Sequence, residues 1–148
     1  MRIALAADHA GYVLKDELAA WLREAGHEVL DLGTNGPDSV DYPQFGGKLA
    51  EAVASGEAER GIVVCGSGIG ISIAVNRNPK CRCARVSEPL SAALAREHND
   101  ANVLALGARL IGSDMAKACV NAFLGTQFAG GRHQRRVDQL SKLLEESD

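Results

Sequence analysis

The stretch from Gly61 to Val75 carries the residue types best suited to chemistry in this chain. It reads Gly-Ile-Val-Val-Cys-Gly-Ser-Gly-Ile-Gly-Ile-Ser-Ile-Ala-Val, so a short β-branched run delivers Cys65 into a loop with glycine at every second position. Glycines let the backbone approach a ligand closely and turn successive N–H groups towards one oxyanion. The positive end of the helix expected to follow favours a thiolate over a thiol. The stretch therefore predicts an oxyanion site with a cysteine suited to be a base or a nucleophile.

A dinucleotide fingerprint and a P-loop are the alternatives for such a glycine loop. Glu88 lies about where the ribose-binding acid of a dinucleotide fingerprint belongs, but Ile71 stands in place of the third glycine. The Lys-Ser/Thr pair of a P-loop is absent from the sequence. A single phosphate or another small oxyanion fits better, while a turn that merely lets the next helix pack closely stays open for Gly70.

Polar residues follow two other predicted strands at the same edge of the sheet. Asp8 and His9 come directly after the strand Arg2–Ala7, and Arg109 comes soon after the strand Val103–Leu106. Ligands of open parallel sheets bind beyond the carboxyl ends of the strands. These three residues and the glycine loop are therefore expected to share one site.

His98 is expected away from that edge, and two arginines are expected on the last helix. His98 precedes the strand Val103–Leu106, which places it at the amino edge of a parallel sheet. If it belongs to the same site, a second subunit must supply it; otherwise it is a helix C-terminal histidine that interacts with the helix dipole. Arg132 and Arg136 share one face of the last helix, where they form either a phosphate clamp or a solvated basic turn.

Strands and helices are predicted to alternate along the chain. Strands are expected over Arg2–Ala7, Val29–Leu32, the apolar run ending at Cys65, Arg82–Val86 and Val103–Leu106. Helices are expected between Gly11 and Gly26, from Pro43 to Gly56, after the glycine loop, from Pro89, from Ser113 to Gly125, and from about 132 to 146. These βαβ units predict a single-domain, three-layer α/β/α fold over residues 1–148, with a Rossmann-like five-stranded parallel sheet and helices on both faces.

The sequence also makes predictions about side-chain direction and helix capping. The residues expected to face inward include Val13 on the first helix and Leu90, Ala93 and Leu94 on the fourth. Ser87 and Ser113 are expected to cap the fourth and fifth helices. Arg85 sits awkwardly in its strand, because a strand of a parallel sheet should be a buried apolar run.

The composition is that of a soluble globular protein. Of the 148 residues, 46% are hydrophobic and 24% are charged. The net charge of -3 gives no general attraction to nucleic acid or to an anionic membrane. Met1–Leu5 is too short for a signal peptide or a membrane span, so we expect a cytoplasmic protein. The four cysteines suit reduced thiols, and Cys81 with Cys83 is only a weak candidate for a metal site.

Several motifs in a fixed order are similar to those of the ribose-5-phosphate isomerase type B family, in the same superfamily as the galactose-6-phosphate isomerase subunits. The resemblance covers nearly the whole chain, and Arg85 replaces a residue that is usually apolar in the family. The motifs are Asp8-His9-Ala10-Gly11, Asp41-Tyr42-Pro43, Cys65 to Ser72, Ser87-Glu88-Pro89, His98 to Val103, and Gly130-Gly131-Arg132-His133 with Arg136.

The resemblance implies a role for each matching residue. Cys65 would be the general base, since another branch of the family has a glutamate base where this chain has Ile71. His98 would be the acid that opens the sugar ring, with Ser67 positioning sugar oxygens. The implied substrate-binding residues are Asp8, His9, Tyr42, Gly66, Gly68, Ile69, Gly70, Asn99, Arg109, Arg132 and Arg136.

These matches imply reversible isomerisation of ribose 5-phosphate and ribulose 5-phosphate in the pentose phosphate pathway, through ring opening and a cis-enediolate. They imply no metal and no organic cofactor, and a homodimer or a dimer of dimers with composite active sites. The last helix would contribute to the shared site. An isomerase of a six-carbon sugar phosphate, such as allose 6-phosphate or galactose 6-phosphate, remains an alternative. A non-catalytic phosphosugar-binding module is the alternative from a different class, and a redox-sensing role for Cys65 is the weakest.

Overall fold

The computed structural model describes residues 1–145 and contains a five-stranded parallel sheet. The strands are β1 (Arg2–Ala7), β2 (Glu28–Asp31), β3 (Arg60–Cys65), β4 (Cys83–Arg85) and β5 (Val103–Gly107). They lie in the order β2-β1-β3-β5-β4, and every neighbouring pair is parallel. The three central strands are near-continuous buried apolar runs, as expected for a sheet that is covered on both faces.

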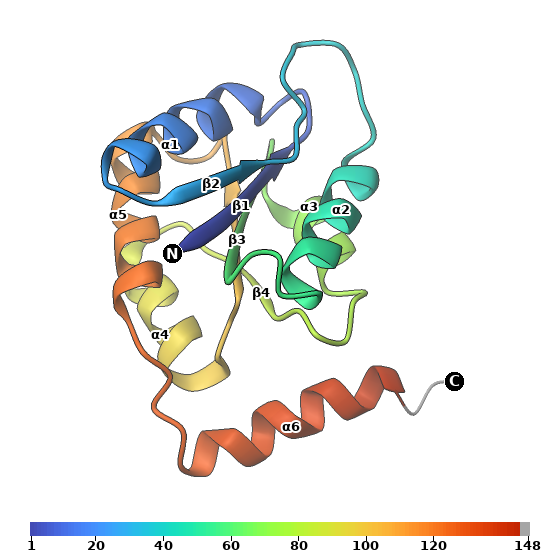
Figure 1. The fold of residues 1–148 in the computed structure, drawn as a ribbon, viewed down its shortest axis with the longest axis vertical. Helices are drawn as coiled ribbons and strands as arrows, with labels where there is room; N and C mark the ends of the chain where they lie inside the picture. Colours follow the sequence, from blue (N-terminus) through green and yellow to red (C-terminus); the bar gives the residue numbers. More distant parts are fainter. Residues whose placement is uncertain (146–148) are drawn as a thin grey trace.

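Helices cover both faces of this sheet, as predicted. They are α1 (Tyr12–Glu24), α2 (Tyr42–Ala54), α3 (Ile69–Val75), α4 (Pro89–Asn99), α5 (Ser113–Gly125) and α6 (Arg132–Glu145). The helices α1, α4 and α5 lie on one side of the sheet and α2 and α3 on the other (Figure 1). The α/β/α architecture is therefore confirmed.

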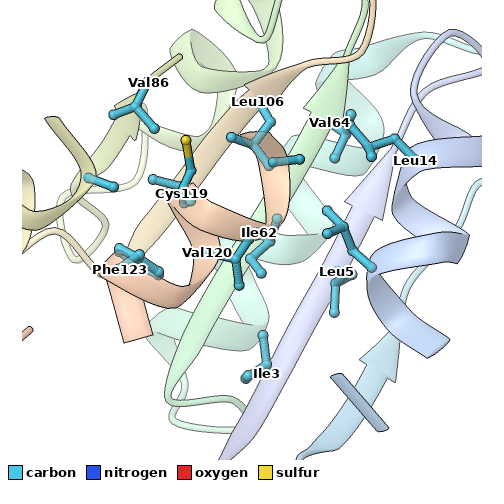
Figure 2. Close-up of a cluster of buried hydrophobic side chains, with 14 of the residues drawn as sticks. Ile3, Leu5, Leu14, Ile62, Val64, Val86, Leu106, Cys119, Val120 and Phe123 are labelled. Carbon is cyan, nitrogen blue, oxygen red and sulfur yellow. The ribbon is translucent and has the colours of Figure 1, made fainter. Parts of the chain in front are cut away.

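Each face of the sheet has its own hydrophobic core. On the first face, alternate residues of the central strands pack against α1 and α5 (Figure 2). The labelled residues include Ile3, Leu5, Ile62, Val64 and Leu106 from the strands and Leu14, Val120 and Phe123 from the helices. On the second face, Val63 and Ala105 of the sheet join Leu49 of α2 and Ile71 of α3. This two-sided burial holds the carboxyl ends of the strands in fixed positions.

The predicted inner face of α4 was wrong. Leu90 is 67% exposed and Leu94 is 37% exposed, whereas Ala92 and Ala95 are buried. The helix therefore turns small residues towards the first core, which allows close packing against α5. Val13 of α1 is likewise 65% exposed rather than inward-facing.

Both predicted serine caps were also wrong. Glu88 caps α4, and its carboxylate accepts a hydrogen bond from the Ser91 N–H. Hydrogen bonds from Ser91 lower the pKa of Glu88. Gly112 is the N-cap of α5, while Ser113 is already helical and donates its hydroxyl to Glu17 at 2.6 Å. In each case the residue next to the expected cap has the required extended backbone.

The cysteines are all free thiols, as expected. Cys65, Cys81 and Cys119 are buried and Cys83 is partly buried. Burial raises the pKa of the Cys81 thiol to about 11. In residues 1–145, no cluster of three or more histidine, cysteine or acidic side chains has the arrangement of a metal site. None of the helices described is long and apolar enough to cross a membrane.

Helix α6 stands apart from the sheet. It lies at the end of the molecule opposite the long loop between β2 and α2 (Figure 1), and it contacts α4. Gly130 and Gly131, both with positive φ, make the break that precedes it. Only its inner side is covered: Val137 is buried, whereas Leu140 and Leu143 are 46% and 67% exposed. The predicted end of this helix, at residue 146, lies outside the described residues.

Candidate active site

An open cavity of about 490 Å³ lies at the carboxyl edge of the sheet. Its walls come from the ends of β1, β3 and β5 and from the start of α2. The lining residues are Asp8, His9, Ala10, Tyr42, Cys65, Gly66, Ser67, Ile69, Gly70, Arg109 and Leu110. The structure thus brings together the polar groups that the strand ends were expected to place in one site.

Cys65 is the last residue of β3, and its side chain is at the floor of this cavity. The residue is 5% exposed, and its Sγ accepts a hydrogen bond from the Gly68 N–H at 3.2 Å. This hydrogen bond fixes the position of the sulfur within the cavity.

The glycine loop has the conformation that its composition predicts. Gly68 has φ 76°, and a Cβ atom there would lie 2.8 Å from the carbonyl carbon of Leu106. Gly68 therefore lies under the cavity rather than on its wall. Within the described part of the chain, the N–H groups of Gly66 and Ser67 donate to no protein acceptor. These two amides are available for an oxyanion in the cavity.

Gly70 of α3 makes room for the aromatic side chain at the start of α2. A Cβ atom at Gly70 would lie 2.7 Å from Cζ of the Tyr42 ring. Tyr42 is the first residue of α2 and is 41% exposed at the cavity wall. The close packing that the sequence left open for Gly70 is therefore a contact between α3 and the first residue of α2, at the cavity wall.

Asp8 and His9 have different roles in the turn after β1. The Asp8 carboxylate is 7% exposed and accepts hydrogen bonds from the N–H groups of Ala10 and Gly11. His9 Nδ1 accepts the N–H of Val40 at 3.1 Å. Neutral His9 therefore carries its proton on Nε2, so the other side of the ring is a hydrogen-bond donor.

Lys15 is a buried charged residue behind the site for which the sequence pattern gave no role. Its side chain is completely buried, and its Nζ lies 2.7 Å from Asp31 Oδ1 and 2.8 Å from Asn35 Oδ1. These bonds tie α1 to the start of the loop that carries Val40 and leads to Tyr42. The pattern of α1 gave no signal, because its inner positions were read from apolar residues alone.

The remaining predicted site residues lie elsewhere in the same chain. His98 and Asn99 are at the end of α4, and Arg132 and Arg136 are in the first turns of α6. Asn99 lines a separate cavity of about 390 Å³ between β4 and α6. These four residues are thus at the amino edge of the sheet, as the position of His98 before β5 predicted.

The histidines at this second location stack. The rings of His98 and His133 are 4.6 Å apart at an interplanar angle of 17°. Desolvation, with the positive charges of His98, Arg132 and Arg136, lowers the pKa of His133. This concentration of positive charge is suited to a phosphate group. The sequence included His133 only as part of a motif and assigned it no role.

Comparisons with known proteins show the family of this chain. The family profile described as Ribose/Galactose Isomerase matches residues 3–140. The chain is 49% identical over 142 residues to ribose-5-phosphate isomerase B of Escherichia coli (strain K12), covering 96% of this chain and 95% of that protein. Ribose-5-phosphate isomerase B of Clostridium thermocellum has a structure that matches with a TM-score of 0.99 and 50% identity, over 100% of both chains.

A further structure contains a bound sugar phosphate. It is that of ribose-5-phosphate isomerase B from Mycoplasma genitalium with bound ribulose-5-phosphate, and it matches with a TM-score of 0.94 and 37% identity. The match covers 98% of this chain and 97% of that one. The chain therefore belongs to the ribose/galactose isomerase family and, within it, to the type B ribose-5-phosphate isomerases.

Proposed function

We propose that this chain, as one isomerase domain, interconverts ribose 5-phosphate and ribulose 5-phosphate with Cys65 as the general base. One observation carries the assignment: the Cys65 sulfur accepts the Gly68 N–H beside the free amides of Gly66 and Ser67. A base and an oxyanion site are the two groups that proton transfer next to a carbonyl requires. The ligand in the Mycoplasma genitalium structure is the ketose of this pair.

The reaction follows from these two groups. The Cys65 thiolate removes the proton from C2 of the open-chain aldose, and the C–H electron pair forms the C1–C2 double bond of an enediolate. Negative charge moves to the former carbonyl oxygen, where the N–H groups of Gly66 and Ser67 stabilise it. The thiol then returns the proton to C1, the hydroxyl proton passes from O2 to O1, and the ketose is formed. Ser67 and Tyr42 line the cavity. In this mechanism their hydroxyl groups orient the sugar hydroxyls.

The opening of the furanose ring and the binding of the phosphate involve a second subunit. We infer a homodimer, or a dimer of dimers, in which His98 and Asn99 of one chain face Cys65 of the other. Arg132 and Arg136 then hold the phosphate, with Arg109 and His9 at the cavity wall. Exposed apolar side chains give such an assembly its contact surfaces. They include Ile69 and Ile73 of α3, Leu90 of α4 and Leu143 of α6.

The free thiols are consistent with a reducing compartment, so we also propose a cytoplasmic location. The six-carbon alternative is tested by comparing kcat/KM for ribose 5-phosphate with that for allose 6-phosphate. We expect the five-carbon substrate to be preferred. The opposite preference would transfer the assignment to the longer sugar.

Cys65→Ala tests the base directly. We expect kcat to fall by roughly 10²–10⁴-fold, because proton transfer loses its positioned acceptor. The hydrogen bound to the reacting carbon of the substrate should also stop exchanging with D₂O, which NMR measures. Cys83→Ala is the control, since it removes a thiol that lies outside this cavity. Exchange that continues in Cys65→Ala would show that another group is the base.

A further inference from the structure

Arg85, which fitted poorly into a buried strand, reaches the catalytic loop. It is the last residue of β4, an edge strand, and its side chain is exposed. Its guanidinium Nε donates a hydrogen bond to the carbonyl oxygen of Ser67 at 3.0 Å. Gly107 of β5 lies beside this hydrogen bond, and a Cβ atom there would lie 2.7 Å from the Ser67 carbonyl. Glycine at that point therefore leaves the Ser67 carbonyl accessible from β4.

The donor to the Ser67 carbonyl differs in kind from the donors to the other carbonyl groups of the loop. The oxygen atoms of Cys65 and Gly66 accept backbone N–H groups from Ala108 and Arg109, at 2.9 and 3.0 Å. The oxygen of Gly68 accepts the N–H of Ser72 in α3. Among residues 65–68, Ser67 is thus the one whose carbonyl is held by a side chain, and that side chain is cationic.

The Ser67 carbonyl and the Gly68 N–H belong to the same peptide group. One end of this peptide accepts from the Arg85 guanidinium, and the other end donates to Cys65 Sγ at 3.2 Å. A charged donor at the oxygen polarises the peptide and strengthens its N–H as a donor. The chain of contacts therefore runs from a fixed positive charge, through one peptide, to the sulfur.

We propose that Arg85 is a positioning residue that stabilises the Cys65 thiolate through the Ser67–Gly68 peptide. It also holds the orientation of the loop from which the free amides project. The guanidinium does this without contacting the substrate. This proposal builds on the proposed function, but its central claim concerns the thiol and can be measured without substrate.

Other charged or titratable groups face Cys65 from the surrounding elements. They are Asp8 and His9 after β1, Tyr42 of α2 and Arg109 after β5. Helix α3 contributes no ionisable side chain between Ile69 and Val75. All of these groups are retained when Arg85 alone is replaced, so a change in thiol ionisation would report on the guanidinium.

The test measures alkylation of Cys65 by iodoacetamide as a function of pH, with mass spectrometry of the peptide to separate it from the other thiols. In Arg85→Met, we expect the midpoint of this pH profile to rise by roughly 0.5–1 pH unit, because the thiolate loses a polarised donor. Near neutral pH, kcat should fall by about threefold to tenfold with little change in KM. Arg85→Lys should restore part of both effects, since it keeps the charge.

Arg23→Met is the matched control, because it removes an exposed arginine from the last turn of α1. It should leave the alkylation midpoint and kcat unchanged. An unchanged midpoint in Arg85→Met, or an equal shift in Arg23→Met, would overturn the proposal. A shifted midpoint in a protein whose Cys65→Ala variant still exchanges substrate hydrogen would support the thiol contact and reject only the base assignment. Circular dichroism of the Arg85 variants establishes that each is folded.

Discussion

The surroundings of the Cys65 sulfur depend on how closely individual backbone atoms approach it. The Gly68 N–H reaches it at 3.2 Å only because Gly68 has a positive φ and no side chain between its backbone and Leu106. Gly70 has a different function, which is to leave space for the Tyr42 ring. Alternate glycines in the loop thus serve two purposes, one beside the sulfur and one beside the Tyr42 ring.

This distinction gives a prediction for Gly70→Ala. The new methyl group would meet the Tyr42 ring, which must move within the cavity. We expect kcat/KM to fall by roughly 10–100-fold, since displacements of about 1 Å in a site have effects of this size. The alkylation profile of Cys65 should not change. Gly47→Ala in α2, where a Cβ atom meets nothing within 4 Å, is the control and should retain full activity. Full activity in Gly70→Ala would contradict the proposed role of Tyr42.

At the scale of elements, a buried lysine joins a helix, a strand and a loop. Lys15 of α1 pairs with Asp31 at the end of β2 and also binds Asn35 in the following loop. That loop returns to the site through the Val40 N–H, which holds His9 in one tautomer. The position of His9 therefore depends on an ion pair that does not line the cavity.

Lys15→Met should be destabilising. The substitution removes the Nζ donor from Asp31, whose side chain is 24% exposed, and from Asn35, so we expect the free energy of unfolding to fall by roughly 1–3 kcal/mol. Urea unfolding followed by circular dichroism measures this change. Lys80→Met removes an exposed lysine and should change stability by less than about 0.5 kcal/mol. Similar stabilities for the two variants would show that the contacts of Lys15 contribute little.

At the scale of the whole molecule, the two groups of predicted site residues lie at opposite edges of one sheet. Cys65 is at the carboxyl edge, whereas His98, at the end of α4, and Arg132, at the start of α6, are near the amino edge. Figure 1 shows α6 beside the end of the molecule where α4 lies. Residues of a rigid sheet cannot exchange edges. In the proposed function a single chain holds two half-sites, and a two-fold assembly would give two complete ones.

Complementation between two inactive variants tests this arrangement. Cys65→Ala and His98→Gln are expected to be inactive alone, since each lacks one catalytic group. In mixed dimers, one site would contain both substitutions and the other would contain neither. Random mixing in equal amounts would then restore about a quarter of wild-type activity. Co-expression with two different affinity tags isolates the mixed dimers, and their inactivity would indicate that each site is built from one chain.

The sequence by itself determines most of the helices and strands and the edge of the sheet at which the residues next to the strands lie. Apolar periodicity and glycine positions determine the elements, because they depend on local geometry that repeats every two or 3.6 residues. The polar lining of the cavity was predicted from residues at or just after the ends of strands, such as Asp8, Cys65 and Arg109. The parallel order of the strands then determined which edge each one occupies.

Tertiary structure alone decided the features that involve surfaces or distant partners. The rotation of α4, with Ala92 inward and Leu90 outward, depends on the shape of the facing helix rather than on hydrophobicity. The Lys15 contacts join residues 16 and 20 positions apart, and the bond from Arg85 to Ser67 spans 18. No local pattern encodes such bonds, because each requires two separate segments to arrive at hydrogen-bond distance. Arg85 did not fit the pattern of a buried strand. Its proposed role depends on the pairing of β4 with β5, which places its guanidinium within hydrogen-bond distance of the loop that follows Cys65.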